Sequence, residues 1–202
     1  MKNIFQDYIK KELPAKFLMI TVGLPATGKT QVAAEAAKIK NCPVLRSDII
    51  RLDVLKGLDI LDEKVAGDMD KRLAVYAEMF RLAEEILKKS ESVILDATFI
   101  TQRLREKAAH IADHNHKPLV IVHVECPQEI ALARIARRSQ TVYESNAITK
   151  QAYMNNVAEF ENVNIEAIKS AFPTLGITYI QLNTYTLKGT NNNILITKVE
   201  KR

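Results

Sequence analysis

An eight-residue segment near the N-terminus constrains this chain more than any other feature: Gly23-Leu24-Pro25-Ala26-Thr27-Gly28-Lys29-Thr30. It follows a short apolar run at Phe17 to Val22 and precedes an alanine-rich helical pattern at Val32 to Ile39. The two glycines let successive backbone amides turn inward, the lysine adds a positive charge, and the last threonine offers a hydroxyl to a metal ion. The helix that follows adds the positive end of its dipole. This order of strand, loop and helix predicts a phosphate-binding loop.

We expect this loop to bind ATP and Mg²⁺. Lys29 is the expected catalytic charge, and Thr30 is an expected magnesium ligand. Ala26 stands where many kinase loops have glycine, so the prediction requires a negative φ there. The expected nucleotide-binding residues are Gly23, Pro25, Ala26, Thr27, Gly28, Lys29 and Thr30.

The rest of the chain alternates short apolar runs with helical patterns, which predicts right-handed βαβ crossovers and a sheet covered on both faces. The expected fold is a three-layer α/β/α domain over residues 1–202 with a mainly parallel five-stranded sheet and a mobile helical lid at about 134–148. Further strands are expected at Pro43 to Leu45, Val93 to Leu95, Leu119 to Val124 and Ile177 to Leu182. Helices are expected at Asp62 to Lys89 with a break allowed at Gly67, Thr101 to His114, from Pro127, Thr149 to Ile168, and Asn191 to Lys201, although 191–193 could equally begin a turn.

The composition indicates a globular protein but does not identify its ligand. A chain of 202 residues with 47% hydrophobic and 26% charged content can bury a substantial core. The net charge of +5 suits an anionic ligand, but the basic residues are dispersed, so charge does not separate a nucleotide from a nucleic acid. Two cysteines are too few for a disulfide framework, which favours the cytoplasm. We expect no membrane span, because no apolar run approaches the roughly 20 residues that one needs.

Polar residues follow the second and third predicted strands, at the edge of a parallel sheet where ligands bind. Asp48 precedes Arg51 by three residues, so a carboxylate that could accept a hydroxyl proton would lie near a cation that could hold an anionic group. The alternative is that Ser47 or Asp48 only caps a helix. Asp96 ends an apolar run in the manner of a carboxylate that orients magnesium or substrate, with Thr98 as a weaker candidate. The alternative for Asp96 is a cap in a strand-to-helix turn.

A cluster of arginines leads into the predicted lid. Arg134 and Arg138 lie four residues apart and share a helix face, with Arg137 beside them. Arginines on a lid can offset the charge that develops between the β- and γ-phosphates. We expect Arg134 to bind the nucleotide and Arg138 to be catalytic. The alternative is a solvated basic turn favoured by the helix dipole.

With these motifs in view, residues Phe17 to Glu161 resemble the small phosphate-loop kinases of the AAA-type ATP-binding class. These include the 5′-hydroxyl polynucleotide kinase domain, gluconate kinase, and kinase-like domains fused to aminoglycoside phosphotransferase-like modules. The likeness rests on the phosphate loop, Arg46-Ser47-Asp48-Ile49-Ile50-Arg51, Val93-Ile94-Leu95-Asp96-Ala97-Thr98, and Glu125-Cys126-Pro127 leading to Arg134 and Arg138. It implies that Asp48 is a general base, that Arg51 contacts the acceptor, that Asp96 lies in the acceptor site, and that Arg138 is on a lid.

The function predicted is transfer of the γ-phosphate of ATP to a hydroxyl of a small molecule or of a nucleic-acid 5′ end. A nucleic acid is not favoured as the acceptor, because Ile148 to Asn164 does not match a nucleic-acid clamp. The alternative is an ATPase or a nucleotide-dependent regulatory module with no phosphorylated acceptor. The sequence leaves the acceptor and the oligomeric state open.

Overall fold

The computed structural model describes residues 4–58, 65, 68–89, 92–138, 149–185 and 194–202. Its centre is a six-stranded sheet of strand order β2-β3-β1-β4-β5-β6. The strands are β1 (Phe17–Val22), β2 (Val44–Arg46), β3 (Ser92–Asp96), β4 (Leu119–Glu125), β5 (Ile177–Asn183) and β6 (Leu195–Lys201). The first five strands run parallel, and β6 pairs antiparallel with β5.

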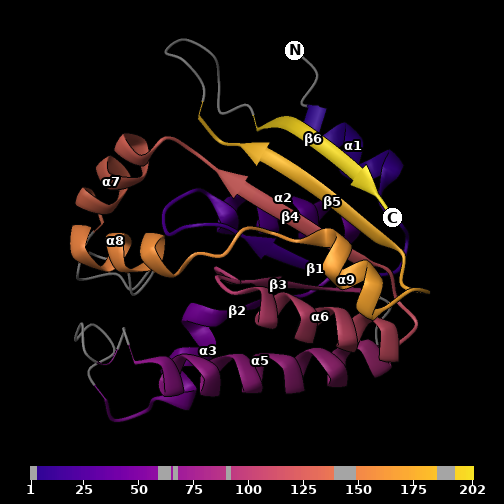
Figure 1. Ribbon diagram of the computed structural model, residues 1–202, viewed down its shortest axis with the longest axis horizontal. Helices are drawn as coiled ribbons and strands as arrows, with labels where there is room; N and C mark the ends of the chain where they lie inside the picture. The colour runs from indigo at the N-terminus through magenta and orange to yellow at the C-terminus, as the bar shows by residue number, and fades with distance from the viewer. Residues whose placement is uncertain (1–3, 59–64, 66–67, 90–91, 139–148, 186–193) are drawn as a thin grey trace.

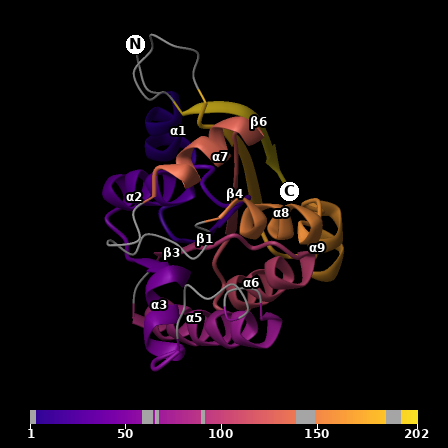
Figure 2. The ribbon, with the colours of Figure 1, turned by 90° about the vertical axis from the view of Figure 1, so that its left-hand side faces the viewer.

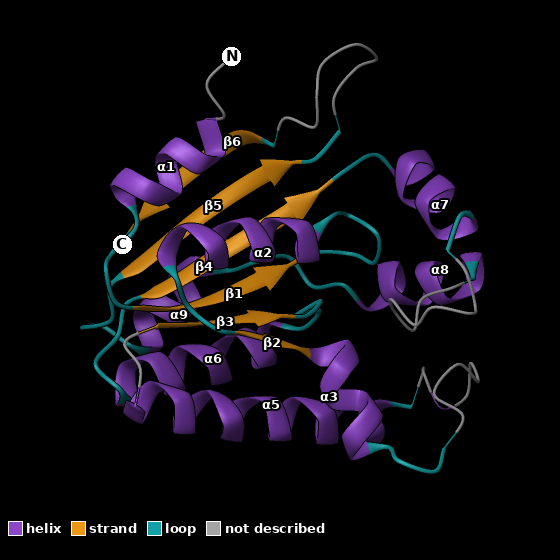
Figure 3. Cartoon of the chain, turned by 180° about the vertical axis from the view of Figure 1, so that it is seen from behind, coloured by secondary structure: helices purple, strands orange, loops and turns teal. Residues whose placement is uncertain are grey.

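Helices cover both faces of this sheet, which confirms the predicted three-layer α/β class (Figures 1 and 2). One face carries α1 (Ile4–Glu12) and α2 (Lys29–Lys40), seen in front of the strands in Figure 3. The opposite face carries α5 (Met69–Lys89), α6 (Gln102–His114) and α9 (Ile165–Ala171). The remaining helices, α3 (Ser47–Val54), α7 (Gln128–Ala136) and α8 (Lys150–Glu159), lie toward the carboxyl edge of the strands (Figure 3).

Each face of the sheet has its own apolar core. Strand β1 shows why: all six of its side chains are buried, and alternate residues enter opposite cores. Leu18 and Ile20 pack with α5 and α6, whereas Phe17 and Met19 pack with α1 and α2. A strand covered on both faces has to read as a continuous apolar run, as β1 does.

The prediction of five strands was wrong by one, because the helix expected at Asn191 to Lys201 is the strand β6 where the chain is described. The sequence of β6, Leu-Ile-Thr-Lys-Val-Glu-Lys, is rich in β-branched residues. Residues Lys198, Glu200 and Lys201 also suit an edge strand, because charged side chains discourage pairing with another chain.

Two predicted helices have different bounds in the structure. Helix α5 begins at Met69 because the Asp68 carboxylate accepts hydrogen bonds from the Asp70 and Lys71 amides. The earlier part of the predicted helix and the break at Gly67 lie outside the described residues, apart from the helical Val65. The single helix predicted at Thr149 to Ile168 is divided into α8 and α9, and the Asn164 side chain caps the second of them. Most of the predicted lid, residues 139–148, also lies outside the described part of the chain.

Candidate functional site

The phosphate loop connects β1 to α2 through two residues whose backbone conformations exclude an ordinary side chain. Gly23 has a φ of 143°, and a Cβ added there would lie 2.3 Å from the carbonyl oxygen of Val124. Gly28 is the N-cap of α2 with a φ of 97°. Only glycine adopts these conformations without strain, so both glycines of the motif have a structural reason.

The requirement for a negative φ at Ala26 was wrong. Ala26 has a φ of 62°, in the left-handed region that costs an L-residue roughly 1–2 kcal/mol. Two hydrogen bonds stabilise this part of the loop: Arg134 Nη1 donates to the Ala26 carbonyl at 3.0 Å, and the Thr27 hydroxyl donates to the Leu24 carbonyl at 3.0 Å. Pro25, which stands between Leu24 and Ala26 in the sequence, is buried.

Lys29 is buried under the loop, and its ammonium group donates to the Leu24 carbonyl at 2.7 Å. Burial lowers the pKa of Lys29 to about 8, and the positive charge of Arg138 acts in the same direction. The carboxylates of Asp96 and Asp48 oppose this shift. A buried ammonium group whose pKa is lowered despite two nearby carboxylates fits a polyanionic ligand, since phosphate oxygens would stabilise its charge more strongly.

Asp96 ends β3 beside the loop, with its side chain only 5% exposed. Its carboxylate accepts hydrogen bonds from Thr21 at 3.1 Å and from Thr30 at 2.7 Å. The buried Nε of Arg46 lies 3.8 Å from Asp96 Oδ2 and has no hydrogen-bond partner among the described residues. The cap of α6 is Thr101, so Asp96 is not the helix cap that the sequence left open.

The pair of Thr30 and Asp96 fits a magnesium ion. Magnesium prefers oxygen ligands and is held by one or two protein groups together with substrate phosphates, which is what a threonine and an aspartate beside a phosphate loop provide. The described residues contain no group of three or more His, Cys, Asp or Glu side chains that could hold a metal by themselves.

Asp48 and Arg51 lie on α3, at the end of β2. Burial and the nearby Asp96 carboxylate raise the pKa of Asp48, whereas Lys29, Arg46 and Arg51 oppose the rise. These influences place the Asp48 carboxylate within electrostatic reach of the phosphate loop. Arg51 is buried at 7% exposure on the same short helix. The N-cap of α3 is Arg46 and no side chain caps it, so neither Ser47 nor Asp48 serves as the cap.

Thr98 lies between the loop and α5. Its carbonyl accepts a hydrogen bond from the Gly23 amide at 3.1 Å, and its hydroxyl lies 3.4 Å from the Tyr76 hydroxyl. Tyr76 also accepts a hydrogen bond from the Phe99 amide at 2.8 Å, which supports the left-handed φ of 43° at Phe99. The structure therefore joins Thr98 to the phosphate loop through its backbone.

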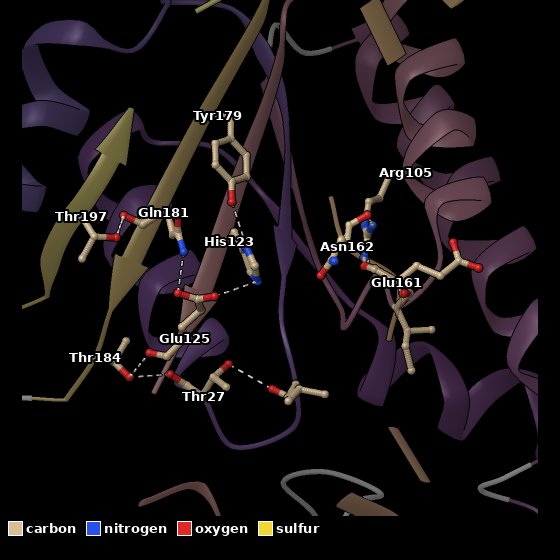
Figure 4. A network of polar contacts seen from close by, with 12 residues as sticks. Thr27, Arg105, His123, Glu125, Glu161, Asn162, Tyr179, Gln181, Thr184 and Thr197 are labelled. Carbon is tan, nitrogen blue, oxygen red and sulfur yellow. Dashed lines mark hydrogen bonds and ion pairs between the residues drawn. The ribbon is translucent and has the colours of Figure 1, made fainter. Parts of the chain in front are cut away.

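Arg134 is not part of a solvated basic turn. It contacts the phosphate loop next to the end of β5. Its guanidinium donates to Ala26, to the Thr184 hydroxyl at 3.2 Å and to the Thr184 carbonyl at 3.1 Å. The Thr184 hydroxyl in turn donates to the Thr27 carbonyl (Figure 4). Arg138 follows α7 and is half-buried, with its charge felt by Lys29. Both arginines are therefore brought to the loop, Arg134 by direct contact.

Sequence reasoning missed Arg105, which is fully buried on α6. Its guanidinium donates to the Phe99 and Ile100 carbonyls after β3, and to the Glu161 and Asn162 carbonyls between α8 and α9 (Figure 4). This side chain joins the segment beside Thr98 to the segment that follows α8. The signal in the sequence was an arginine on the stripe of Ala108, Ala109 and Ala112, where an apolar residue is usual. Thr21, a hydroxyl within an apolar strand, was the corresponding signal for the Asp96 contact.

A family model described as an AAA domain matches residues 18–163. The chain therefore belongs to this family, and its fold is that of the small phosphate-loop kinases. Uncharacterized proteins of Mycobacterium bovis and Mycobacterium tuberculosis are 29% identical to it over 129 residues, which is 60% of this chain and 26% of theirs. The chain thus spans about a quarter of the length of these curated relatives.

Three solved structures share the fold. A putative kinase from Chloroflexus aurantiacus has a TM-score of 0.60 at 17% identity, covering 75% of this chain and 84% of that one. A gluconokinase from Sinorhizobium meliloti has a TM-score of 0.54 at 13% identity, covering 84% of each chain. The AvrRxo1-ORF1:ORF2 complex with ATP has a TM-score of 0.57 at 15% identity, covering 96% of this chain and 61% of that one. None of the described helices is long and apolar enough to cross a membrane.

Proposed function

We propose that this protein is an ATP-dependent kinase that transfers the γ-phosphoryl group to a hydroxyl of its acceptor. The observation that carries the proposal is the placement of Asp48, a half-buried carboxylate with a raised pKa, within electrostatic reach of Lys29 and Asp96. On this side of the loop, a carboxylate could accept the proton of an attacking hydroxyl. The kinase-like fold and the ATP-bound neighbour support the same reading.

On the donor side, the loop amides and Lys29 bind and orient the phosphates. Thr30 and Asp96 would hold Mg²⁺, which supplies positive charge to the phosphate oxygens when bound. Arg134 keeps the loop in its left-handed turn through the Ala26 carbonyl. Arg138 adds positive charge on the side of α7, in the position proposed for a lid arginine.

On the acceptor side, Asp48 accepts the proton of the attacking hydroxyl. Burial raises the pKa of Asp48, which makes its ionised form a stronger base than an ordinary aspartate. Arg51 and Thr98 orient the acceptor beside it. Arg105 is a positioning residue in this scheme, because it acts through the backbone next to Thr98 and touches no reacting atom.

The test is transfer of labelled γ-phosphate from ATP to a panel of sugars, nucleosides, aminoglycosides and 5′-hydroxyl oligonucleotides. We expect at least one acceptor to be labelled by the parent and none by Lys29→Ala. Asp48→Asn should bind ATP normally and label the best acceptor poorly. Equal transfer by Asp48→Asn and the parent would refute the proposed base. Rapid ATP hydrolysis with no labelled acceptor would favour the nucleotide-dependent ATPase instead.

A further inference from the structure

One face of the sheet changes from apolar to polar near the carboxyl ends of β4 and β5. In β4, Leu119 and Ile121 are fully buried on this face, and His123 and Glu125 follow them. Strand β5 changes from apolar to polar at the same level of the sheet, because Ile121 pairs with Tyr179 and His123 pairs with Gln181. We call His123, Glu125, Tyr179 and Gln181 the β4–β5 polar cluster.

The four side chains of the cluster form one continuous chain of contacts (Figure 4). The Tyr179 hydroxyl lies 2.9 Å from His123 Nδ1, and His123 Nε2 lies 3.7 Å from Glu125 Oε1. Gln181 Nε2 donates to the other carboxylate oxygen of Glu125 at 2.6 Å. The Phe160 ring stacks on the imidazole with centroids 5.8 Å apart and planes inclined by 21°.

The surroundings of the cluster favour one arrangement of its protons and charge. Burial lowers the pKa of His123 and raises the pKa of Tyr179 to about 12, so at neutral pH the imidazole is uncharged and the phenol keeps its proton. Because the Glu125 carboxylate only accepts, its position 3.7 Å from Nε2 favours the tautomer with the proton on Nε2, in which Nδ1 accepts from Tyr179. The cluster therefore has one negative charge, on a side chain that is 45% exposed.

The cluster lies beside the phosphate loop, on the side away from α3. His123 pairs with Val22, the residue before Gly23, and the charge of Lys29 contributes to lowering its pKa. Strand order places β4 three strands from β2, whose end leads to Asp48. At about 4.8 Å between neighbouring strands, the two ends lie roughly 14 Å apart. That separation is the length of a two-ring molecule rather than of a single sugar.

The other face of the same two strands is more apolar than the face that carries the cluster. Val120, Val122, Val124, Ile180 and Leu182 are fully buried there, beside the buried Thr178. A half-buried polar network contributes little more than well-packed apolar side chains would, and it leaves a carboxylate to be satisfied by solvent or by a ligand. Ligands bind at this edge of parallel sheets.

We propose that Glu125, held by His123 and Gln181, binds hydrogen-bond-donating groups of the acceptor at the end remote from the phosphorylated hydroxyl. The ligand class is a two-ring acceptor that carries hydroxyls or amines on its second ring. An anionic second ring is disfavoured by the charge of Glu125. The inference rests on the proposed kinase function, because Asp48 defines the other end of the acceptor.

The test compares Glu125→Gln, which keeps the shape and removes the charge, with Glu129→Gln, a matched control four residues along the chain and exposed. The acceptors are a neutral disaccharide, a two-ring aminoglycoside fragment and a monosaccharide. We expect Glu125→Gln to raise KM for the two-ring acceptors about 10- to 100-fold, as for the loss of one or two charge-assisted hydrogen bonds. The ATP Kd and the KM for the monosaccharide should stay at the parent values. A larger effect on the amine than on the disaccharide would identify an ammonium group as the ligand.

Equal KM values for Glu125→Gln, Glu129→Gln and the parent would overturn the inference and leave the proposed kinase function standing. If the parent labels no acceptor, the kinase proposal fails, and calorimetry of the same compounds with the ADP-loaded protein decides the inference. Binding that is weakened in Glu125→Gln supports it, and binding that is absent or insensitive to Glu125 overturns it. Tyr179→Phe, which removes the hydrogen bond to Nδ1, should weaken the same acceptors several-fold.

Discussion

The phosphate loop and helix α3, the proposed acceptor helix, both lie at the carboxyl edge of the sheet, but their side chains are buried to different degrees. In the loop, Thr27 and Lys29 are only 3% and 9% exposed, and their polar groups already have partners within the protein. On α3, Ile49 and Leu52 are 45% and 41% exposed, beside the half-buried Asp48. Because these polar groups already have hydrogen-bond partners, a nucleotide that binds the loop would replace those partners. The exposed apolar side chains of α3 leave a surface that a bound acceptor would bury.

This difference explains why the donor is easier to infer than the acceptor. The Lys29–Leu24 and Thr30–Asp96 hydrogen bonds reproduce inside the protein the contacts that phosphate and magnesium would make. On the acceptor side, the nearby residues restrict charge and length but not the identity of the molecule.

The largest effect is expected on the acceptor side from Asp48→Asn. Loss of a general base lowers kcat by about 10²- to 10⁴-fold. The ATP Kd should change far less, because Asp48 acts on the loop only through its charge near Lys29. Steady-state kinetics with the best acceptor and calorimetry with ATP measure the two quantities. Asp53→Asn, an exposed aspartate on the same helix, is the control and should leave both unchanged. If Asp48→Asn also bound ATP much more weakly, the donor and acceptor sides of the site would not be separable.

The second effect is expected on the donor side from Gly23→Ala. The new Cβ would lie 2.3 Å from the Val124 carbonyl oxygen, and the φ of 143° adds strain. We expect a loss of about 2–4 kcal/mol in the free energy of unfolding and loss of ATP binding. Gly57→Ala is the matched control, since its φ is 91° but nothing lies within 4 Å of the added Cβ. Its cost should be about 1 kcal/mol by denaturant unfolding. Equal costs for the two variants would contradict the close approach at Gly23.

The third effect is a pH dependence that arises from Lys29. Its pKa of about 8 in the free protein rises when phosphates approach, so ATP binding takes up a proton above pH 8. The ATP Kd should therefore increase up to about tenfold per pH unit above pH 8. Calorimetry between pH 7 and 9.5 measures this slope, and Lys29→Arg, which stays charged, should remove it.

The same lysine affects the stability of the ligand-free protein. In the unfolded chain Lys29 regains its ordinary pKa of 10.5, so between pH 8 and 10.5 the unfolded state binds more protons than the folded state. Lys29 therefore destabilises the fold below pH 8, and this cost is relieved as the pH rises through that window. Lys29→Met should be more stable than the parent at pH 7, and the difference should shrink toward pH 10. A difference that is constant with pH would contradict the lowered pKa.

The smallest effect is expected from Arg134→Gln, because Arg134 braces the loop through neutral carbonyl and hydroxyl groups. We expect a loss of about 1–2 kcal/mol in stability and a fall in kcat of less than about tenfold. Thr184→Val, which removes the partner hydroxyl, should behave in the same way. A fall in kcat of about 10³-fold for Arg134→Gln alone would instead show contact with the transferring phosphoryl group.

The fold and the donor half of the site were largely predictable because their signals are local. The phosphate loop, its strand and its helix are contiguous in sequence, and each of the five parallel strands is a short apolar run next to a helical pattern. The edge strand β6 was not recognised, because its pattern of exposed and charged residues resembles a surface helix. The break between α8 and α9 was missed for a different reason: the carbonyls of Glu161 and Asn162 are turned toward Arg105, which is more than fifty residues away in sequence.

The sequence by itself determined that this chain has a phosphate loop on a parallel α/β sheet and that acidic residues follow the next two strands. It could do so because glycine conformations, helix dipoles and apolar periodicity act over a few residues. Only the tertiary structure decided the left-handed Ala26, the inward contacts of Arg134, and the meeting of His123 and Glu125 with Tyr179 and Gln181. Those features depend on strand order and register, which bring together side chains that no short stretch of sequence relates.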